Sequence, residues 1–271
     1  METSGLNLLA YSTTLPTPPN GFTSDPRNIS PSSPPNRPRP LEDESWYYYL
    51  TEIMLRKLQM RIDIFFQNKR REAYQGAGES AELFFRGMVE ALKEFDFQLK
   101  SYYETLPPVM FFSLDDLTPC SDGLRHFLRW RLFCVNHDIT LPALYILLHN
   151  NVSRWSKELV AELVRLANAC LLLDVKILRS SITTYRHQNI WISIRTGVRS
   201  ALVLIAAERL VARQLPGLER LLVPDRTSWE DGAQTLMKGL QYWSSESRDC
   251  SEYSKLLQKL HPAFQDQETR T

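Results

Sequence analysis

The stretch Arg186-His187-Gln188-Asn189-Ile190-Trp191-Ile192-Ser193-Ile194-Arg195 opens an apolar segment that runs to Ala207. From Trp191 onward, apolar residues recur at steps of three and four, at Ile194, Val198, Leu202 and Ile205. This period predicts a helix with one continuous apolar face. Arg195 and Arg199 stand four residues apart beside that face, so periodicity alone indicates a core helix with a solvated basic edge.

The same helical period extends from Glu44 towards the C-terminus, with few strand signals. It predicts eight helices in an all-α fold. Ser45 is the predicted N-cap of the first helix, and Gly76 and Gly78 mark its exit. The other predicted helices span 79–103, 122–136, a short segment whose first turn holds Pro142, 155–183, 189–214, 229–243 and 253–260.

The first two helices each carry a predicted inward-facing stripe. The first stripe consists of Trp46, Leu50, Ile53, Met54, Leu58, Ile62 and Phe65. The second consists of Leu83, Phe84, Met88, Leu92, Phe95 and Leu99. The aromatic run from Trp46 to Tyr49 fits either a core or an interface, and the core is the favoured interpretation.

A change in composition divides the chain. Residues 1–44 hold nine of the sixteen prolines and few apolar residues after Tyr11, which predicts a disordered segment. Residues 45–262 are enough for one large helical domain or two small ones. We expect the last residues, 263–271, to form a disordered tail.

The formal net charge is +1, from 32 basic and 31 acidic side chains, so no global attraction to nucleic acid or anionic membrane is expected. The strongest local imbalance is a series of bases on predicted helices, and Lys69-Arg70-Arg71 is a short second group. Solvated helix faces and protein salt bridges explain these bases better than direct DNA contact. The series comprises Lys176, Arg179, Arg186, Arg195, Arg199, Arg209 and Arg213.

The longest uninterrupted apolar run, Ala201 to Ala207, is far shorter than the roughly 20 residues of a membrane span. We therefore expect no membrane crossing. The first residues lack the basic cluster and apolar core of a signal peptide, so an intracellular protein is expected.

Catalytic and cofactor motifs are not recognisable, and no cofactor is expected. Asp115-Asp116 invites comparison with the aspartate-rich magnesium site of an all-α terpene synthase, but Leu117-Thr118-Pro119 follows without the further acid that such a site needs. No serine elbow or phosphate-binding loop occurs. The five histidines form no close ligand pair, so we interpret them as lone polar residues; they stand at 126, 137, 149, 187 and 261.

The four cysteines stand at positions 120, 134, 170 and 250, and no two have metal-cluster spacing. This argues against a zinc ribbon, finger or cluster. Cys134 and Cys170 lie in apolar helical contexts, where we expect buried reduced thiols. The sequence thus predicts no metal site.

Four blocks carry a more specific signal. The first is an aromatic helix from Glu44 to Ile53 that ends in Leu55-Arg56-Lys57-Leu58, and the second joins Leu128-Arg129-Trp130-Arg131 to Leu141-Pro142-Ala143-Leu144-Tyr145 and His149. The third holds Arg186-His187, Trp191 and Arg195 before the apolar run. The fourth holds Trp229, Leu240-Gln241-Tyr242-Trp243 and Leu256-Leu257-Gln258-Lys259-Leu260.

In order and spacing these blocks resemble the regulatory (middle homology) domain of fungal zinc binuclear-cluster transcription factors, over residues 44–262. Leu141 stands where the family pattern has arginine. The family's N-terminal cluster of six cysteines has no counterpart in this chain, so its DNA-reading function is not carried over. The motif-matched positions, expected to serve packing, are Trp46, Arg129, Pro142, Tyr145, His149, His187, Trp191, Arg195, Trp229 and Trp243.

The resemblance implies a nuclear transcription regulator that works through protein partners, such as a DNA-binding regulator or co-regulator, and controls a specialised-metabolite gene set. Two alternatives stay open at this point. One is a helical scaffold or ligand-sensing module with no transcriptional role, and the other is an all-α lyase, disfavoured by the missing acids around Asp115 and Asp116. The sequence leaves the oligomeric state open.

Overall fold

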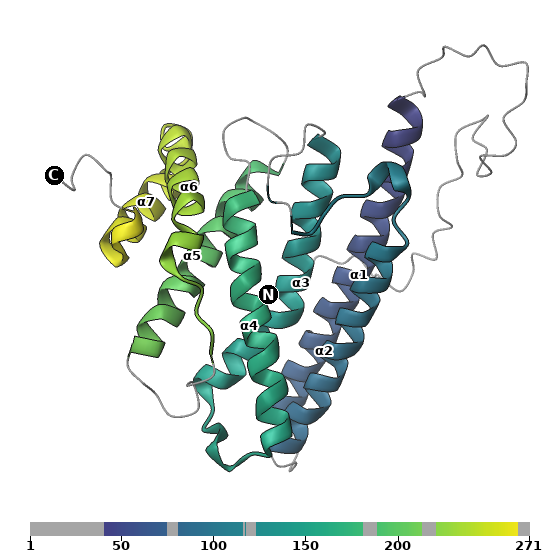
Figure 1. Ribbon diagram of the computed structural model, residues 1–271, viewed down its shortest axis with the longest axis vertical. Coiled ribbons are helices and arrows are strands. Elements are labelled where there is room, and N and C mark those ends of the chain that lie inside the picture. The colour runs from purple at the N-terminus through teal and green to yellow at the C-terminus, as the bar shows by residue number, and fades with distance from the viewer. Residues whose placement is uncertain are drawn as a thin grey trace, which may run out of the picture.

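The computed structural model describes residues 41–74, 81–115, 117, 123–180, 189–212 and 221–264. These ranges hold seven α-helices, a few short 3-10 helices and no strand, which confirms the all-α prediction (Figure 1). The α-helices are α1 (Leu41–Tyr74), α2 (Ala81–Glu104), α3 (Gly123–His149), α4 (Lys157–Ser180), α5 (Ile190–Ala212), α6 (Glu230–Trp243) and α7 (Arg248–Leu260).

The segments predicted to be disordered lie mostly outside the described residues. Residues 41–44 are an exception, since they form the first turn of α1. At the other end, Pro262–Phe264 form a 3-10 helix in which Phe264 is fully buried against Trp229, their ring centroids 5.9 Å apart. The predicted tail boundary at residue 263 is therefore wrong, because this last turn completes the core beneath α6.

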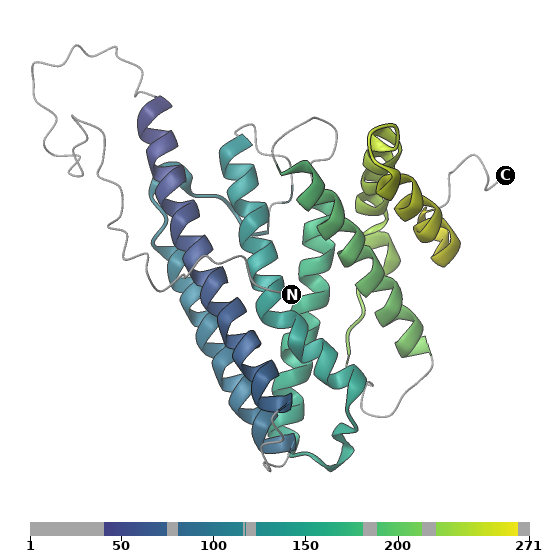
Figure 2. The same cartoon turned by 180° about the vertical axis from the view of Figure 1, so that it is seen from behind.

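Helices α1 and α2 form an antiparallel pair along one side of the molecule (Figures 1 and 2). The Tyr102 hydroxyl, near the end of α2, donates to the Thr51 carbonyl in the first half of α1 at 3.1 Å. Most of the predicted inward residues are buried or half-buried, but Met54 and Leu83 are exposed. Leu55, which the predicted stripe omits, is completely buried, and it shares a helix face with the buried Leu58 and Ile62, three and seven residues further on.

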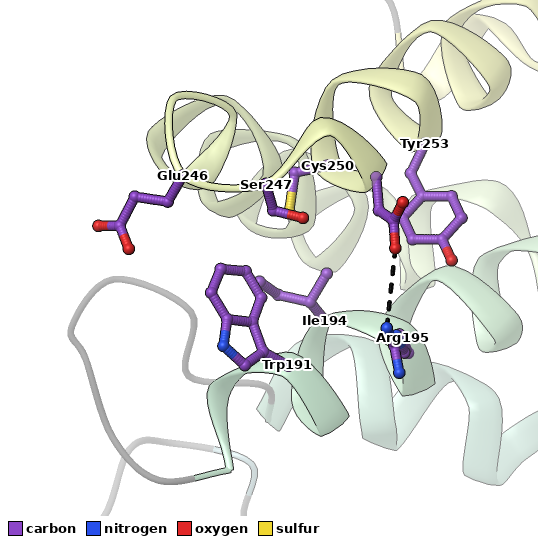
Figure 3. Close-up of a pocket in the computed structure, with 8 residues that line it drawn as sticks. Trp191, Ile194, Arg195, Glu246, Ser247, Cys250 and Tyr253 are labelled. Carbon is purple, nitrogen blue, oxygen red and sulfur yellow. Dashed lines mark ion pairs between the residues drawn. The ribbon is translucent and has the colours of Figure 1, made fainter.

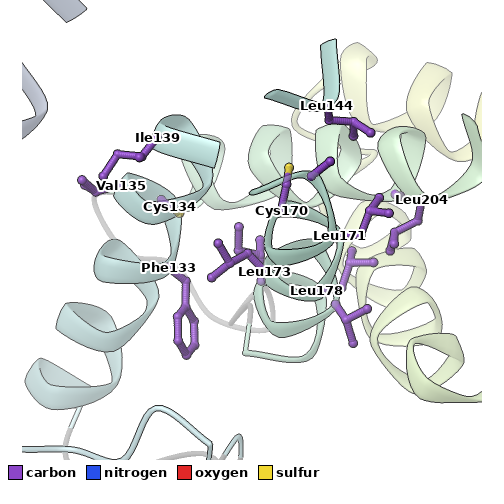
Figure 4. Packing of buried hydrophobic residues seen from close by; sticks show 14 of the residues in the cluster. Phe133, Cys134, Val135, Ile139, Leu144, Cys170, Leu171, Leu173, Leu178 and Leu204 are labelled. Atoms are coloured by element: carbon purple, nitrogen blue, oxygen red, sulfur yellow. The ribbon is translucent and has the colours of Figure 1, made fainter. Parts of the chain in front are cut away.

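Helices α3 and α4 form the centre, where they pack along most of their length. Figure 4 shows Phe133 of α3 near Leu173 of α4 in this core. The sequence predicted two helices here, split before Pro142. Instead, α3 runs through Pro142 without a break, and buried Ile139, Ala143 and Ile146 flank the proline. Burial on both sides offsets the hydrogen bond that proline removes.

Helices α5, α6 and α7 form the third part, on the side of α4 away from α1 and α2 (Figures 1 and 2). The predicted apolar face of α5 is confirmed at Ile194, Val198 and Ile205, which are buried, while Leu202 is half-buried. Helix α6 approaches α4 closely at Gly232, where an added Cβ would lie 2.9 Å from the backbone carbon of Leu178.

Two helices have the length and hydropathy of a membrane span, Gly123–His149 and Ile190–Leu210. In the most apolar 18-residue stretch of each helix, 61% and 56% of the stretch, respectively, is buried inside the protein. Core helices of soluble proteins also have such length and hydropathy. The expected absence of a membrane crossing therefore stays a prediction.

Candidate functional site

A pocket of about 280 Å³ lies between the first turns of α5 and the start of α7 (Figure 3). Helix α5 contributes Trp191 and, one turn later, Ile194 and Arg195. The turn between α6 and α7 and the first turns of α7 supply the opposite wall. This wall consists of Glu246, Ser247, Asp249, Cys250 and Tyr253.

The pocket combines an aromatic wall with an exposed ion pair. The Trp191 ring packs edge-on against Trp243, with centroids 5.8 Å apart, and Trp243 is almost fully buried. Arg195 Nη2 lies 3.7 Å from Asp249 Oδ2, and the two side chains are 67% and 62% exposed (Figure 3). Because water screens so exposed a pair, it adds little to stability and leaves both charges accessible to a bound molecule.

A shallow apolar groove of about 420 Å³ continues from the pocket along α5. Arg195 and Tyr253 line both cavities, so the two are contiguous. Arg199 borders the groove and pairs with Asp138 of α3 at 3.2 Å. The basic edge predicted for this helix thus exists, with each arginine paired to an acid from another helix. The remaining lining of the groove is Val198, Leu202, Val203 and Ala206.

Cys250 lines the pocket and is almost fully buried. Burial, and then the neighbouring Asp249 carboxylate, raise the pKa of Cys250 above that of an ordinary thiol. The thiolate is the nucleophilic form, so this cysteine is not activated for covalent chemistry. Cys250 is therefore a packing residue of the pocket wall in its thiol form.

The structure brings Trp191, Arg195 and Trp243 of the motif-matched positions together, but it scatters the others. His187 lies outside the described residues. Tyr145 and His149 form an exposed ring pair on α3, with centroids 4.1 Å apart. The remaining four are half-buried or buried at separate places in the fold: Trp46 in α1, Arg129 and Pro142 in α3, and Trp229 before α6.

Arg129 has a more specific role than the sequence indicated. It is only 1% exposed, and its Nη2 lies 3.2 Å from His126 Nδ1. His126 Nε2 lies 2.8 Å from the Ser180 carbonyl at the end of α4. This geometry suits a neutral ring that donates to Ser180 and accepts from Arg129. Burial and the Arg129 charge accordingly lower the pKa of His126.

A second site lies in the middle of the α3–α4 interface, where sequence reasoning predicted none. His137 of α3 meets Cys170 and Asp174 of α4, and their candidate ligand atoms all lie within 4.8 Å of one another. His137 Nε2 is 2.9 Å from Asp174 Oδ1, and Cys170 Sγ is 3.9 Å from Asp174 Oδ2. All three side chains are buried, so these residues could hold a metal ion away from solvent.

The electrostatics of this cluster reverse the usual effect of burial on histidine. Burial opposes the charged ring, but Asp138, Asp174 and the Cys170 thiol outweigh it and raise the pKa of His137 to about 11. Burial also raises the pKa of Cys170, so without a metal the thiol stays protonated. A charged His137 beside the Asp174 carboxylate is the expected metal-free state.

The interpretation of all the histidines as lone polar residues is therefore wrong, since His126, His137 and His261 are buried and partnered. The expected buried thiols are confirmed at Cys134 and Cys170. A signal for the cluster was present: Asp174 interrupts the apolar run of α4 one turn after Cys170. Ligand spacing along the sequence does not reveal the cluster, because His137 lies on a different helix from Cys170 and Asp174.

The other acidic candidate does not form a metal site among the described residues. Asp115 is 96% exposed, and its Oδ1 lies 3.1 Å from Lys176 Nζ, while Asp116 lies outside the described residues. A carboxylate paired with lysine on the surface gives no support to a diphosphate-binding magnesium cluster.

Comparisons with protein-family models, with curated proteins and with solved structures find no match for this chain. Neither the fungal regulatory domain nor any other family is shown. The resemblance therefore stays a prediction.

Proposed function

We propose that this chain is a transcription regulator-like protein that acts in the nucleus through a DNA-binding partner. The proposal combines the resemblance of the four sequence blocks with the geometry of the α5–α7 pocket. Control of a specialised-metabolite gene set is its narrower form and depends on the resemblance alone.

The observation that carries the proposal is the meeting of the third and fourth blocks in one place. Trp191 and Arg195 come from the third block and Trp243 from the fourth, yet the two indole rings are in contact and Arg195 lies in the same pocket. Trp191, Arg195 and Trp243, which match the family pattern at distant positions in the sequence, thus lie close together in the structure. This supports a common origin for the blocks beyond chance matches.

The charge arrangement favours action through a protein partner. Lys176, Arg195 and Arg199 each lie within ion-pair distance of an aspartate, and Arg209 donates to the Leu260 carbonyl. A surface that reads duplex DNA presents bases together towards a groove and the phosphates beside it. These four bases instead face acceptors within the protein.

A ligand-sensing module without a transcriptional role is the second candidate, and the contiguous pocket and groove favour it. The pocket ends in the Arg195–Asp249 pair, whereas the groove is lined mainly by aliphatic residues. Ligand sites commonly enclose about 300–1,000 Å³, with mostly apolar walls and a few polar groups. An elongated apolar molecule with one polar end fits this combination.

Chromatin occupancy of the tagged full-length chain, combined with transcript profiling after its deletion, tests the proposal. We expect focused occupancy near genes whose transcripts change. Absent occupancy and unchanged transcripts would refute the regulator and leave the sensing module. Changed transcripts confined to one biosynthetic gene set would support the narrower form.

A pocket-filling variant links the readout to the site. Ser247→Phe places an aromatic ring in the pocket, and Ser245→Phe puts the same ring on the exposed turn beside it. We expect Ser247→Phe to reproduce the transcript changes of the deletion and Ser245→Phe to keep the wild-type transcript levels. Equal responses from the two variants would remove the pocket from the regulatory mechanism.

A further inference from the structure

The buried cluster of the α3–α4 interface has no part in the proposed regulatory pocket. His137 lies on α3, and Cys170 and Asp174 lie four residues apart on α4, so one turn of α4 faces a single ring of α3. The side chains of His137 and Asp174 are 0% exposed. Figure 4 shows Cys170 within the surrounding apolar core. Polar groups in such a place require partners, because an unsatisfied buried group is costly.

The direct contacts within the cluster leave that requirement incompletely met. His137 Nε2 is near Asp174 Oδ1 at 2.9 Å, but among the described residues neither ring nitrogen nor this oxygen has a hydrogen-bond partner of adequate geometry. The ring and the carboxylate thus attract each other as an ion pair, without the alignment of a hydrogen bond. An imidazole nitrogen and a carboxylate oxygen that converge in this way beside the Cys170 sulfur, with all three atoms within 4.8 Å of one another, are placed as the ligands of one metal ion would be.

The ligand types favour zinc. An imidazole nitrogen, a thiolate and a carboxylate are the three side-chain ligands that zinc uses, and a thiolate disfavours magnesium and calcium. Around tetrahedral zinc, with bonds of about 2.0–2.3 Å, ligand atoms stand about 3.3–3.6 Å apart. The distance from His137 Nε2 to Asp174 Oδ1 is 2.9 Å, and that from Cys170 Sγ to Asp174 Oδ2 is 3.9 Å. These values lie on either side of the tetrahedral range, so small side-chain rotations would bring the atoms to zinc-binding positions.

A second carboxylate is placed to orient the histidine. Asp138 Oδ1 lies 3.9 Å from His137 Nδ1, on the ring nitrogen that does not face Asp174, and Arg199 holds the same oxygen at 3.2 Å. Zinc-binding histidines commonly direct their second nitrogen to a carboxylate, which fixes the ring. A slight closure of this contact would complete that arrangement.

We propose that His137, Cys170 and Asp174 bind one zinc ion that ties α3 to α4. On binding, the Cys170 thiol and the charged His137 ring each release a proton to solvent, and zinc bonds to Sγ and to Nε2 as well as to an Asp174 oxygen. Two protons leave as one divalent cation enters, so the net charge of the buried cluster does not change. A small oxygen ligand fills the fourth position, either a water molecule or the hydroxyl of Thr140, which interacts with Cys170.

Metal analysis of the purified full-length chain tests the proposal directly. We expect one zinc per chain after expression with added zinc and gel filtration without chelator. Replacement by cobalt should produce thiolate-to-cobalt charge-transfer absorption. Cys170→Ser should abolish this absorption and weaken zinc binding by more than about tenfold, the loss seen even for supporting residues. Cys134→Ser is the matched control, since it removes another buried thiol of the same core (Figure 4).

A measurement on the unmodified chain keeps the proposal falsifiable if Cys170→Ser fails to fold. Free zinc at about 100 times its dissociation constant should lower the equilibrium constant of urea unfolding about 100-fold. The absence of stoichiometric zinc together with an unchanged unfolding curve would overturn the proposal. An identical cobalt spectrum in folded Cys170→Ser would do so as well, because the thiolate ligand would then be wrong. Transcript profiles do not enter these readouts, so failure here is separate from failure of the proposed function.

Discussion

The α3–α4 cluster and the α5–α7 pocket both contain oppositely charged groups, but in opposite environments. His137 and Asp174 are completely buried, with an ion-pair distance of 2.9 Å, whereas Arg195 and Asp249 are more than 60% exposed and 3.7 Å apart. Water screens the second pair and is excluded from the first. Burial, more than residue type, therefore makes the His137–Asp174 pair important for stability and leaves the Arg195–Asp249 pair available for binding.

Asp174→Ala should have the largest effect. It leaves the charged His137 ring without its nearest carboxylate in a dry interface, and breaking a buried ion pair on one side costs about 3–5 kcal/mol. The free energy of unfolding, measured by urea denaturation at neutral pH with a chelator present, should fall by that amount. Asp249→Ala is the control from the pocket, with an expected loss below about 1 kcal/mol. Similar losses from both variants would contradict the comparison.

Gly232→Ala should have the next largest effect on stability. Gly232 lies where α6 packs against α4. The added Cβ would lie 2.9 Å from the backbone carbon of Leu178, and such overpacking costs about 1–3 kcal/mol. Gly87→Ala is the matched control, because nothing lies within 4 Å of its added Cβ. Thermal unfolding should show a lower midpoint for the first variant and an unchanged or higher one for the second. A stable Gly232→Ala protein would show that α6 moves away from α4 at little cost.

Acidification should produce a smaller change, through His126. Its pKa is lowered in the folded state by burial and by Arg129, so the unfolded chain takes up the proton first. The associated stability is present above about pH 6.5, the ordinary histidine pKa, and is lost as pH falls towards the lowered folded value. His137 has a raised pKa, so its contribution is fully present below about pH 6.5 and is lost only as pH rises towards about 11.

Urea denaturation at pH 7.5 and pH 5.5 measures this change. The stability of the wild-type chain relative to His126→Gln should fall between pH 7.5 and pH 5.5, because the variant cannot titrate at this position, whereas the opposing contribution of His137 is the same in both proteins. His261 also has a pKa lowered by burial and remains in both proteins, so the difference between them isolates His126. An equal loss in both would assign the acid sensitivity to other groups.

The smallest effect should come from the exposed pair of the pocket. A double-mutant cycle of Arg195→Ala and Asp249→Ala should give a coupling energy of about 0.2–1 kcal/mol that decreases as salt is added. Urea unfolding of the four proteins at low and high salt provides the measurement. A coupling that is larger and insensitive to salt would mean that the pocket closes around this pair in solution.

Sequence periodicity alone determined the fold class and the buried face of α5. Ile194, Val198 and Ile205 are where steps of three and four place them, because the helical repeat is a local property of the chain. Local rules failed where packing opposed them. Pro142 was expected to begin a helix and lies inside one, and Met54 was expected inside and is exposed. In both cases contacts with neighbouring helices decided the outcome.

The sequence alone also marked Trp191 and Arg195 for attention, but only tertiary structure joined them to Trp243 and Asp249 in one pocket. The buried cluster depended on tertiary structure still more. His137 stands beside the polar Asn136 and Asp138 on α3, Asp174 interrupts an apolar run on α4, and the partner of each side chain lies on the other helix. Periodicity shows which face of a helix is apolar, whereas the packing of α3 on α4 decides which polar atoms on those faces meet.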